Sequence, residues 1–162
     1  MIDNTPDILI VEDNKYNVEF ILEALEKNGI VDRAKVFQDG EEALNYLFAV
    51  GDYAGRDSCK RPRVILLDLK LPKVDGLEVL RKIRSNVLTN MIPVVVFSSS
   101  TEDWDRLESY RLGANSYIIK PVSYENFVES AAKIGLYWAF LNVPPDQDGK
   151  ECSTQMSFII PR

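Results

Sequence analysis

The stretch VILLDLKLPKVDG, residues 64–76, joins an apolar run to an acidic residue, Asp68, and then to a turn. An uninterrupted apolar run is typical of a central strand in a parallel sheet, because both faces of that strand are buried. Pro72 and Gly76 follow the run, and both residue types favour turns. Open parallel sheets bind their ligands outside the carboxyl ends of the strands. We therefore expect an α/β fold with Asp68 at the functional edge of the sheet.

The chain repeats this pattern on both sides of residues 64–76. Strands are predicted at Asp7–Val11, Ala34–Phe37, Val64–Leu67, Val94–Phe97 and Ser116–Ile119. Helices are predicted at Asn14–Asn28, after a capping box of Asp39 and Glu42, around Leu77, Leu80 and Ile83, at Thr101–Leu112, and from Ser123 to about Leu141. The alternation predicts a doubly wound, five-stranded parallel sheet with helices on both faces. Gly51–Arg63 is polar and long for a connection, so we expect a surface loop there.

The length and composition indicate one globular domain. The chain has 162 residues, of which 46% are hydrophobic and 27% are charged. We expect this domain to occupy residues 1–142 and a C-terminal tail to follow at 143–162, with no separate output domain. No apolar stretch is long enough to span a membrane, and the start does not resemble a signal peptide, so we expect a cytoplasmic protein without membrane contact. In that compartment Cys59 and Cys152 are expected to be thiols rather than a disulfide.

The charge and the absence of one residue type restrict the function. The net charge is −6, and the only basic concentration is Lys60, Arg61 and Arg63, so nucleic acid is not expected as a direct partner. The chain has no histidine. It therefore offers no imidazole base, imidazole metal ligand or phosphohistidine, and its chemistry must use carboxylates, lysine or a bound ion.

Polar residues follow the other apolar runs as Asp68 follows its own. Glu12 and Asp13 follow the first run, Ser98 the fourth and Lys120 the fifth. Three carboxylates at one sheet edge repel one another, so we expect a cation among them. Because the candidate ligands are hard oxygens, Mg²⁺ or Mn²⁺ is favoured over zinc or copper.

This set of residues suits phosphoryl transfer to a carboxylate. That reaction needs a positioned nucleophile and neutralisation of charge on the phosphoryl oxygens. Asp68 is the natural nucleophile, Lys120 supplies a positive charge, and Ser98 supplies a hydroxyl donor. Each residue alone has an ordinary structural explanation, as a turn, a loop or a solvated face. Their placement at successive strand ends favours the functional interpretation.

With these residues, Asp7–Leu141 resembles the receiver domains of two-component response regulators, which have a flavodoxin-like fold. The resemblance implies that Asp68 is the phosphoacceptor, that Ser98 and Lys120 contact the phosphoryl group, and that Tyr117 is the switch aromatic. It also implies that Glu12, Asp13, Asp68 and the main-chain carbonyl of Lys70 hold Mg²⁺. Two further implications are a cis Lys120–Pro121 bond and a tuning of acyl phosphate hydrolysis by Lys70 and Ser100. Glu12 departs from the commoner aspartate of the acidic pair.

The resemblance implies a signalling phosphoacceptor rather than an enzyme with a separate substrate. It would be a single-domain regulator in a phosphorelay, catalysing only its own phosphorylation and dephosphorylation. The partners expected are a sensor histidine kinase and an effector protein that the sequence does not identify. The extended Gly51–Arg63 loop and the ending GLYWAFLNVPP resemble regulators associated with phytochrome-type kinases.

Apolar residues on the last two helices suggest a further contact. Trp104 and Tyr110 lie on a helix with a thin apolar stripe, and the last helix carries Leu136, Tyr137, Trp138, Phe140 and Leu141. This set is too wide for one buried face. We expect a homodimer that phosphorylation modulates, rather than complete burial of these residues in the core and under the tail.

Three other functions are compatible with parts of this pattern. A degenerate receiver would act as a phosphate-independent interaction module, but the acids, hydroxyl and lysine are all present. A Mg²⁺-dependent phosphohydrolase with an Asp nucleophile usually has a second Asp two residues later, where this chain has Lys70. A flavodoxin-like cofactor-binding module is disfavoured because an acidic site repels a flavin phosphate and no phosphate-binding glycine loop is visible.

Overall fold

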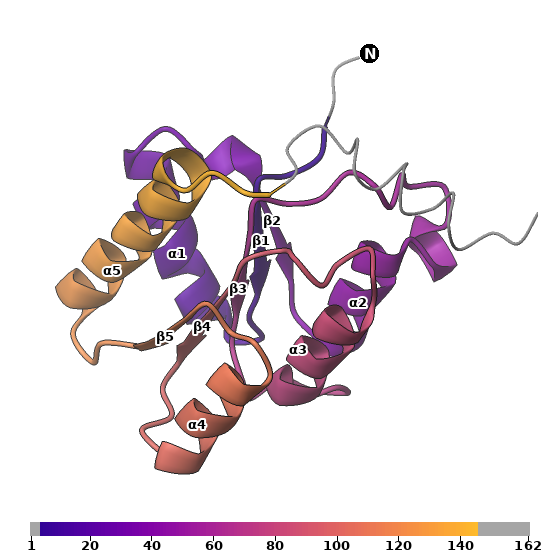
Figure 1. Ribbon diagram of the computed structural model, residues 1–162. Coiled ribbons are helices and arrows are strands. Elements are labelled where there is room, and N and C mark those ends of the chain that lie inside the picture. The colour runs from indigo at the N-terminus through magenta and orange to yellow at the C-terminus, as the bar shows by residue number, and fades with distance from the viewer. Residues whose placement is uncertain (1–3, 146–162) are drawn as a thin grey trace, which may run out of the picture.

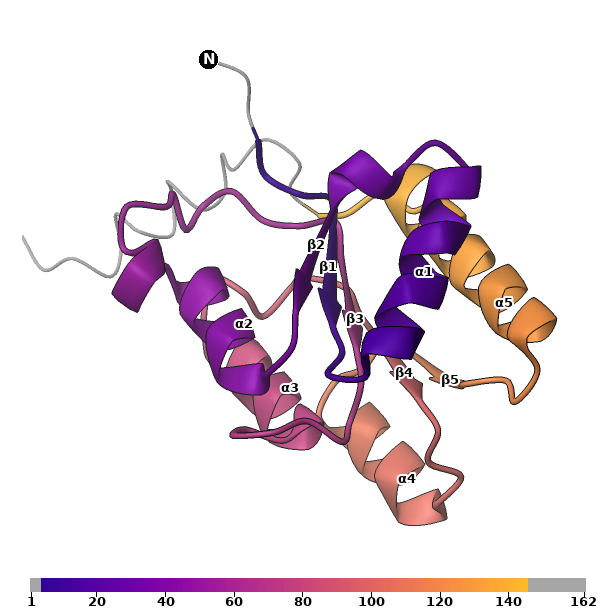
Figure 2. The same cartoon turned by 180° about the vertical axis from the view of Figure 1, so that it is seen from behind.

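The computed structural model describes residues 4–145, which form a parallel sheet between two layers of helices (Figures 1 and 2). The strands are β1 (Ile8–Val11), β2 (Ala34–Phe37), β3 (Val64–Leu67), β4 (Val94–Ser98) and β5 (Ser116–Ile119). The α-helices are α1 (Lys15–Lys27), α2 (Gly40–Phe48), α3 (Gly76–Ser85), α4 (Asp103–Arg111) and α5 (Tyr124–Leu136). All pairings are parallel in the order β2-β1-β3-β4-β5, which confirms the predicted fold class.

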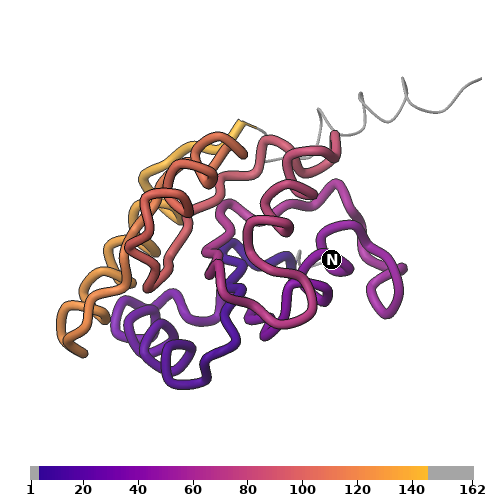
Figure 3. The backbone as a smooth tube through the Cα atoms, turned by 90° about the horizontal axis from the view of Figure 1, so that it is seen from below, coloured from indigo at the N-terminus to yellow at the C-terminus, as the bar shows by residue number. Residues whose placement is uncertain are grey.

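The sheet separates two apolar cores. Buried residues of α1 and α5 pack on one face, and those of α2 and α3 pack on the other. The central strand β3 is buried along its whole length, as an uninterrupted apolar run requires. The strand register aligns Val11 with Leu67 and Leu67 with Val96. The residues that follow β1 and β3 therefore lie side by side at the carboxyl edge, which faces the viewer in Figure 3.

Local capping explains where the helices begin. Asn14 accepts hydrogen bonds from the amides of Tyr16 and Asn17 at the start of α1, and Ser123 accepts one from Asn126 at the start of α5. The N-cap predicted at Ser123 is thus confirmed. Helix α4 begins at Asp103, two residues later than expected from Thr101. The Ser100 hydroxyl accepts a hydrogen bond from the Glu102 amide and so holds residues 100–102 outside the helix.

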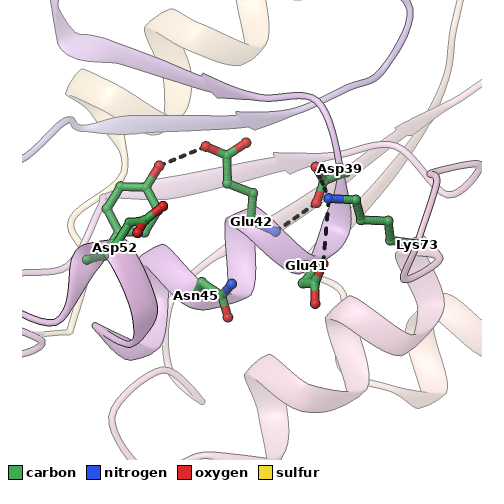
Figure 4. A pocket seen from close by; sticks show the side chains of 7 residues that line it. Asp39, Glu41, Glu42, Asn45, Asp52 and Lys73 are labelled. Carbon is green, nitrogen blue, oxygen red and sulfur yellow. Dashed lines mark hydrogen bonds and ion pairs between the residues drawn. The ribbon is translucent and has the colours of Figure 1, made fainter.

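The long connection after α2 is fastened to that helix. It contains the 3-10 helix η2 (Gly51–Tyr53), and the Tyr53 hydroxyl donates a 2.8 Å hydrogen bond to Glu42. The Asp39 carboxylate accepts a hydrogen bond from the Glu42 amide, as predicted. The Glu42 carboxylate binds the Tyr53 hydroxyl instead, so the second half of the predicted capping box does not form. A polar cavity of about 220 Å³ lies beside α2 (Figure 4). It is lined by Asp39, Glu41, Glu42, Asn45, Asp52, Tyr53 and Lys73.

One expectation about the polar segments is wrong, and another concerns residues that lie mostly outside the described part of the chain. Cys59 is disulfide-bonded, so the expectation of a thiol is wrong; it rested on the redox state of a compartment rather than on geometry. The other cysteine, Cys152, lies outside the described residues. Of the expected tail, only residues 143–145 are described.

The last helix continues to Leu141, close to its predicted end. Its final turn, η3 (Tyr137–Leu141), is a π-helix. Trp138 packs against the core, whereas Leu141 is 74% exposed. Among the described residues, no helix is both long enough and apolar enough to cross a membrane.

Candidate functional site

A buried lysine lies between two buried carboxylates at the carboxyl edge of the sheet. The Lys120 ammonium is 2.5 Å from Glu12 Oε2 and 3.1 Å from Asp68 Oδ2. All three side chains are at least nine-tenths buried. Charges are found in such surroundings only when they are paired, because desolvation is costly. This arrangement brings together residues predicted from three separate strand ends.

Backbone bonds fix the two carboxylates beside each other. The Asp68 amide donates to the Val11 carbonyl, and the Glu12 amide donates to the Phe37 carbonyl. Asp68 Oδ1 accepts a 2.8 Å hydrogen bond from the Leu69 amide. Gly76 packs directly on this turn, since a β-carbon there would lie 2.2 Å from the Asp68 carbonyl oxygen.

The electrostatic environment of Glu12 raises its pKa above the usual value. Burial raises the pKa of the Glu12 carboxyl, and the neighbouring Asp68 charge raises it further. The Lys120 ammonium opposes both effects. The excess negative charge in this buried group is the physical reason to expect an additional cation.

The carboxylates fit a divalent metal ion. One oxygen each from Glu12, Asp13 and Asp68 lies within 4.8 Å of the others. Two oxygens on one Mg²⁺ are separated by at most about 4.2 Å, since each bond is about 2.1 Å. The carboxylates would therefore have to move closer together to bind one ion directly. Asp13 is exposed and available, whereas both Glu12 oxygens already accept hydrogen bonds, from Asn14 and Lys120.

Ser98 and Tyr117 meet at Ser100. Ser98 is fully buried at the end of β4, and its Oγ accepts a 3.2 Å hydrogen bond from the Ser100 amide. The Tyr117 hydroxyl donates a 3.0 Å hydrogen bond to the Ser100 carbonyl. Burial raises the pKa of the Tyr117 hydroxyl, so it remains a donor at neutral pH. The Lys120 amide donates to the Ser98 carbonyl, which links β4 to the residue that carries the ammonium.

One residue near the site was not predicted from the sequence. Asp105 of α4 is almost buried, accepts a 2.5 Å hydrogen bond from the Ser100 hydroxyl, and lies 3.9 Å from the Lys70 ammonium. Its sequence neighbours Trp104 and Arg106 gave no periodic signal that would have distinguished it. The Lys70 side chain itself is 75% exposed.

The Lys120–Pro121 bond corrects an expectation. No peptide bond in the described part of the chain is cis, so this bond is trans. The trans form of an X-Pro bond is ordinarily favoured by about 0.5–1 kcal/mol. With the trans bond, the Lys120 ammonium still reaches both Glu12 and Asp68, so its contacts do not require the cis form.

The chain is similar to known proteins over most of its length. The family model described as "Response regulator receiver domain" matches residues 8–132. The "Probable methanogenesis regulatory protein FilR2" of Methanothrix harundinacea is 42% identical over 138 residues, covering 85% of this chain and 86% of FilR2. Response regulator Rcp1 of Synechocystis is 36% identical over 131 residues, covering 81% of this chain and 87% of Rcp1.

Solved structures show the same fold. The phosphorylated cyanobacterial phytochrome response regulator RcpA is 38% identical, has a TM-score of 0.80, and covers 88% of this chain and 99% of its own. The Mn²⁺-bound form of Rcp1 is 34% identical with a TM-score of 0.79, covering 86% of this chain and 98% of its own. These proteins hold a phosphoryl group and a divalent metal ion, respectively.

Proposed function

The chain belongs to the response regulator receiver domain family, and from this premise we propose that it accepts a phosphoryl group on Asp68 from a sensor histidine kinase. Receiver domains of this family are signalling proteins rather than classical enzymes. The observation that carries the proposal is the Lys120 ammonium, held 3.1 Å from Asp68 in a buried acidic site. We further propose that the chain signals through phosphorylation-dependent protein contacts.

The transfer uses the residues at the sheet edge. An Asp68 carboxylate oxygen attacks the phosphorus of the donor's phosphohistidine, a P–O bond forms, and the P–N bond breaks with its electron pair leaving on the imidazole. Lys120 and the Ser98 hydroxyl would bind phosphoryl oxygens. Glu12, Asp13, Asp68 and the Lys70 carbonyl would hold Mg²⁺, with Glu12 reaching the ion through water, and the ion would neutralise charge on the phosphoryl group.

The donor is proposed to be a phytochrome-type histidine kinase, because RcpA is a phytochrome response regulator. The test is phosphotransfer from the purified, radiolabelled kinase domain of such a protein. We expect the label to pass to this chain in Mg²⁺ and not to pass to Asp68→Asn. Absence of transfer to the native chain from several such kinases would contradict the donor assignment.

The output is proposed to include a homodimer. Exposed apolar side chains occur on α4, at Trp104, Leu107 and Tyr110, and on η3, at Tyr137, Phe140 and Leu141. Their exposed fractions range from 48% to 74%, so neither group is covered by the described chain. Groups of exposed apolar residues commonly mark protein contacts.

Light scattering tests the dimer. We expect the mass to double when Mg²⁺ and beryllofluoride are added, and Leu107→Ser or Leu141→Ser to reduce this change. Val50→Ser is the control, since Val50 is 45% exposed but lies outside both groups. A mass equal to one chain under all conditions would contradict the proposed dimer. It would not contradict the proposed phosphorylation of Asp68.

A further inference from the structure

Helix α4 is unusual because its own buried residues are polar. They are Asp105 and Ser109, whereas Trp104, Leu107 and Tyr110 are 51–63% exposed. A surface helix ordinarily docks through an apolar stripe. Because α4 lacks buried apolar side chains, its position depends strongly on the partners of its buried polar groups.

Asp105 has one close partner outside α4. Its carboxylate accepts a 2.5 Å hydrogen bond from the Ser100 hydroxyl, and the exposed Lys70 ammonium lies farther away at 3.9 Å. A nearly buried carboxylate is costly unless it is hydrogen-bonded. The Ser100 hydroxyl therefore fixes the position of the Asp105 side chain. Through Asp105 it also fixes the position of the N-terminal half of α4.

Ser100 is held from three directions. Its amide donates to Ser98 Oγ, its carbonyl accepts from the Tyr117 hydroxyl, and its hydroxyl donates to Asp105. Two of these partners, Ser98 and Tyr117, belong to the candidate site. A shift of the Ser98 hydroxyl toward a phosphoryl group on Asp68 disturbs the first bond and, through Ser100, the other two.

We propose that Asp105 is the positioning residue that holds α4 in its unphosphorylated arrangement and that phosphorylation releases it. This inference rests on the proposed function, because the phosphoryl group is what draws Ser98 away. The new negative charge on Asp68 also competes with Asp105 for the Lys70 ammonium. A contact present in only one of two states lowers the apparent affinity for a ligand that selects the other state. Asp105 therefore opposes binding of the phosphoryl group.

The experiment measures beryllofluoride affinity by calorimetry in saturating Mg²⁺, together with amide hydrogen exchange of residues 103–111. Asp105→Ala removes the tether from α4, and Ser100→Ala removes it from the other end. Asp105→Asn is the conservative variant. The matched control is Asp103→Ala, which removes the same charge from the same helix at a side chain that is 92% exposed.

We expect Asp105→Ala to bind beryllofluoride roughly tenfold more tightly, a factor equivalent to about 1.4 kcal/mol. Amide exchange in α4 should accelerate in the free variant, while Asp103→Ala should match the native protein. The affinity and the exchange rate of Asp105→Asn should lie between those of the native protein and those of Asp105→Ala. The double variant Ser100→Ala/Asp105→Ala should match Ser100→Ala, because both changes break the same bond.

Two results would overturn the inference while the proposed function stands. One is native binding that requires Asp68, with unchanged affinity in Asp105→Ala and Ser100→Ala. The other is an equal gain in Asp103→Ala, which would assign the effect to helix charge. If the first result were accompanied by a loss of thermal stability, Asp105 would have a purely structural role. Absence of beryllofluoride binding by the native protein would instead overturn the proposed function and the inference together.

Discussion

At the scale of single residues, Gly76 determines how closely α3 approaches the reacting carboxylate. A β-carbon at this position would lie 2.2 Å from the Asp68 carbonyl oxygen and 2.5 Å from Leu69 Cα. Both are backbone atoms, so no side-chain rotation relieves the contact. The glycine in VILLDLKLPKVDG is therefore needed for the position of Asp68 as well as for a turn.

We expect Gly76→Ala to destabilise the fold by roughly 1–3 kcal/mol, the usual cost of overpacking. It should also slow phosphorylation by acetyl phosphate, because the turn that carries Asp68 must shift. Urea unfolding and the labelling rate measure the two effects. Gly55→Ala is the control, since nothing lies within 4 Å of its added β-carbon. Native stability and labelling in Gly76→Ala would disprove the argument.

At the scale of elements, hydrophobic pattern was sufficient for β2, β3 and β5, whose predicted bounds are those observed. It also indicated that Asp68, Ser98 and Lys120 lie at the carboxyl ends of parallel strands, which share one edge of the sheet. It failed where individual polar side chains decide the outcome. The Ser100 hydroxyl accepts the Glu102 amide hydrogen bond, so α4 begins later than predicted. The Glu42 carboxylate accepts a hydrogen bond from Tyr53 and does not complete the capping box. Asp105 is buried because it contacts Ser100, a residue outside its helix. None of these contacts has a periodic signature.

The Tyr53–Glu42 bond predicts a pH-dependent attachment of the long connection. Its hydrogen bond to Glu42, aided by burial, raises the pKa of Tyr53 from 10.0 to about 12. The stabilisation is therefore complete below about pH 10 and is lost as the pH rises toward about 12, because the unfolded chain ionises first. Tyr53→Phe should cost about 1 kcal/mol at neutral pH and less near pH 12.

Urea unfolding at neutral pH and at a pH between 10 and about 12 tests this expectation. The control is Tyr16→Phe, which changes a 60% exposed tyrosine on α1. An equal loss of stability by Tyr53→Phe at both pH values would show that the bond contributes little and that ring packing dominates.

At the scale of the whole molecule, the acidic site couples metal binding to stability. A ligand that binds only the folded state stabilises it by about 2.7 kcal/mol at a concentration one hundred times its Kd. We expect Mg²⁺ to raise the Tm and EDTA to reverse the change. Asp13→Asn should abolish most of this response without breaking the Lys120 contacts, since Asp13 is exposed and outside them.

Scanning calorimetry of the native chain, Asp13→Asn and Asp103→Asn measures the response. Asp103→Asn should behave as the native chain, because its carboxylate lies on α4 outside the acidic cluster. A Mg²⁺ response that Asp13→Asn leaves intact would place the metal elsewhere.

The central claim is that Asp68 accepts a phosphoryl group, and the mass of the intact chain after incubation with acetyl phosphate and Mg²⁺ tests it most directly. Borohydride reduction and peptide mapping locate the modified carboxylate, with Asp75→Asn as a control from the same loop. We predict one hydroxylamine-labile phosphoryl group on Asp68, dependent on Mg²⁺, present in Asp75→Asn and absent in Asp68→Asn. An unmodified native chain, or a modification that persists in Asp68→Asn, would contradict the account.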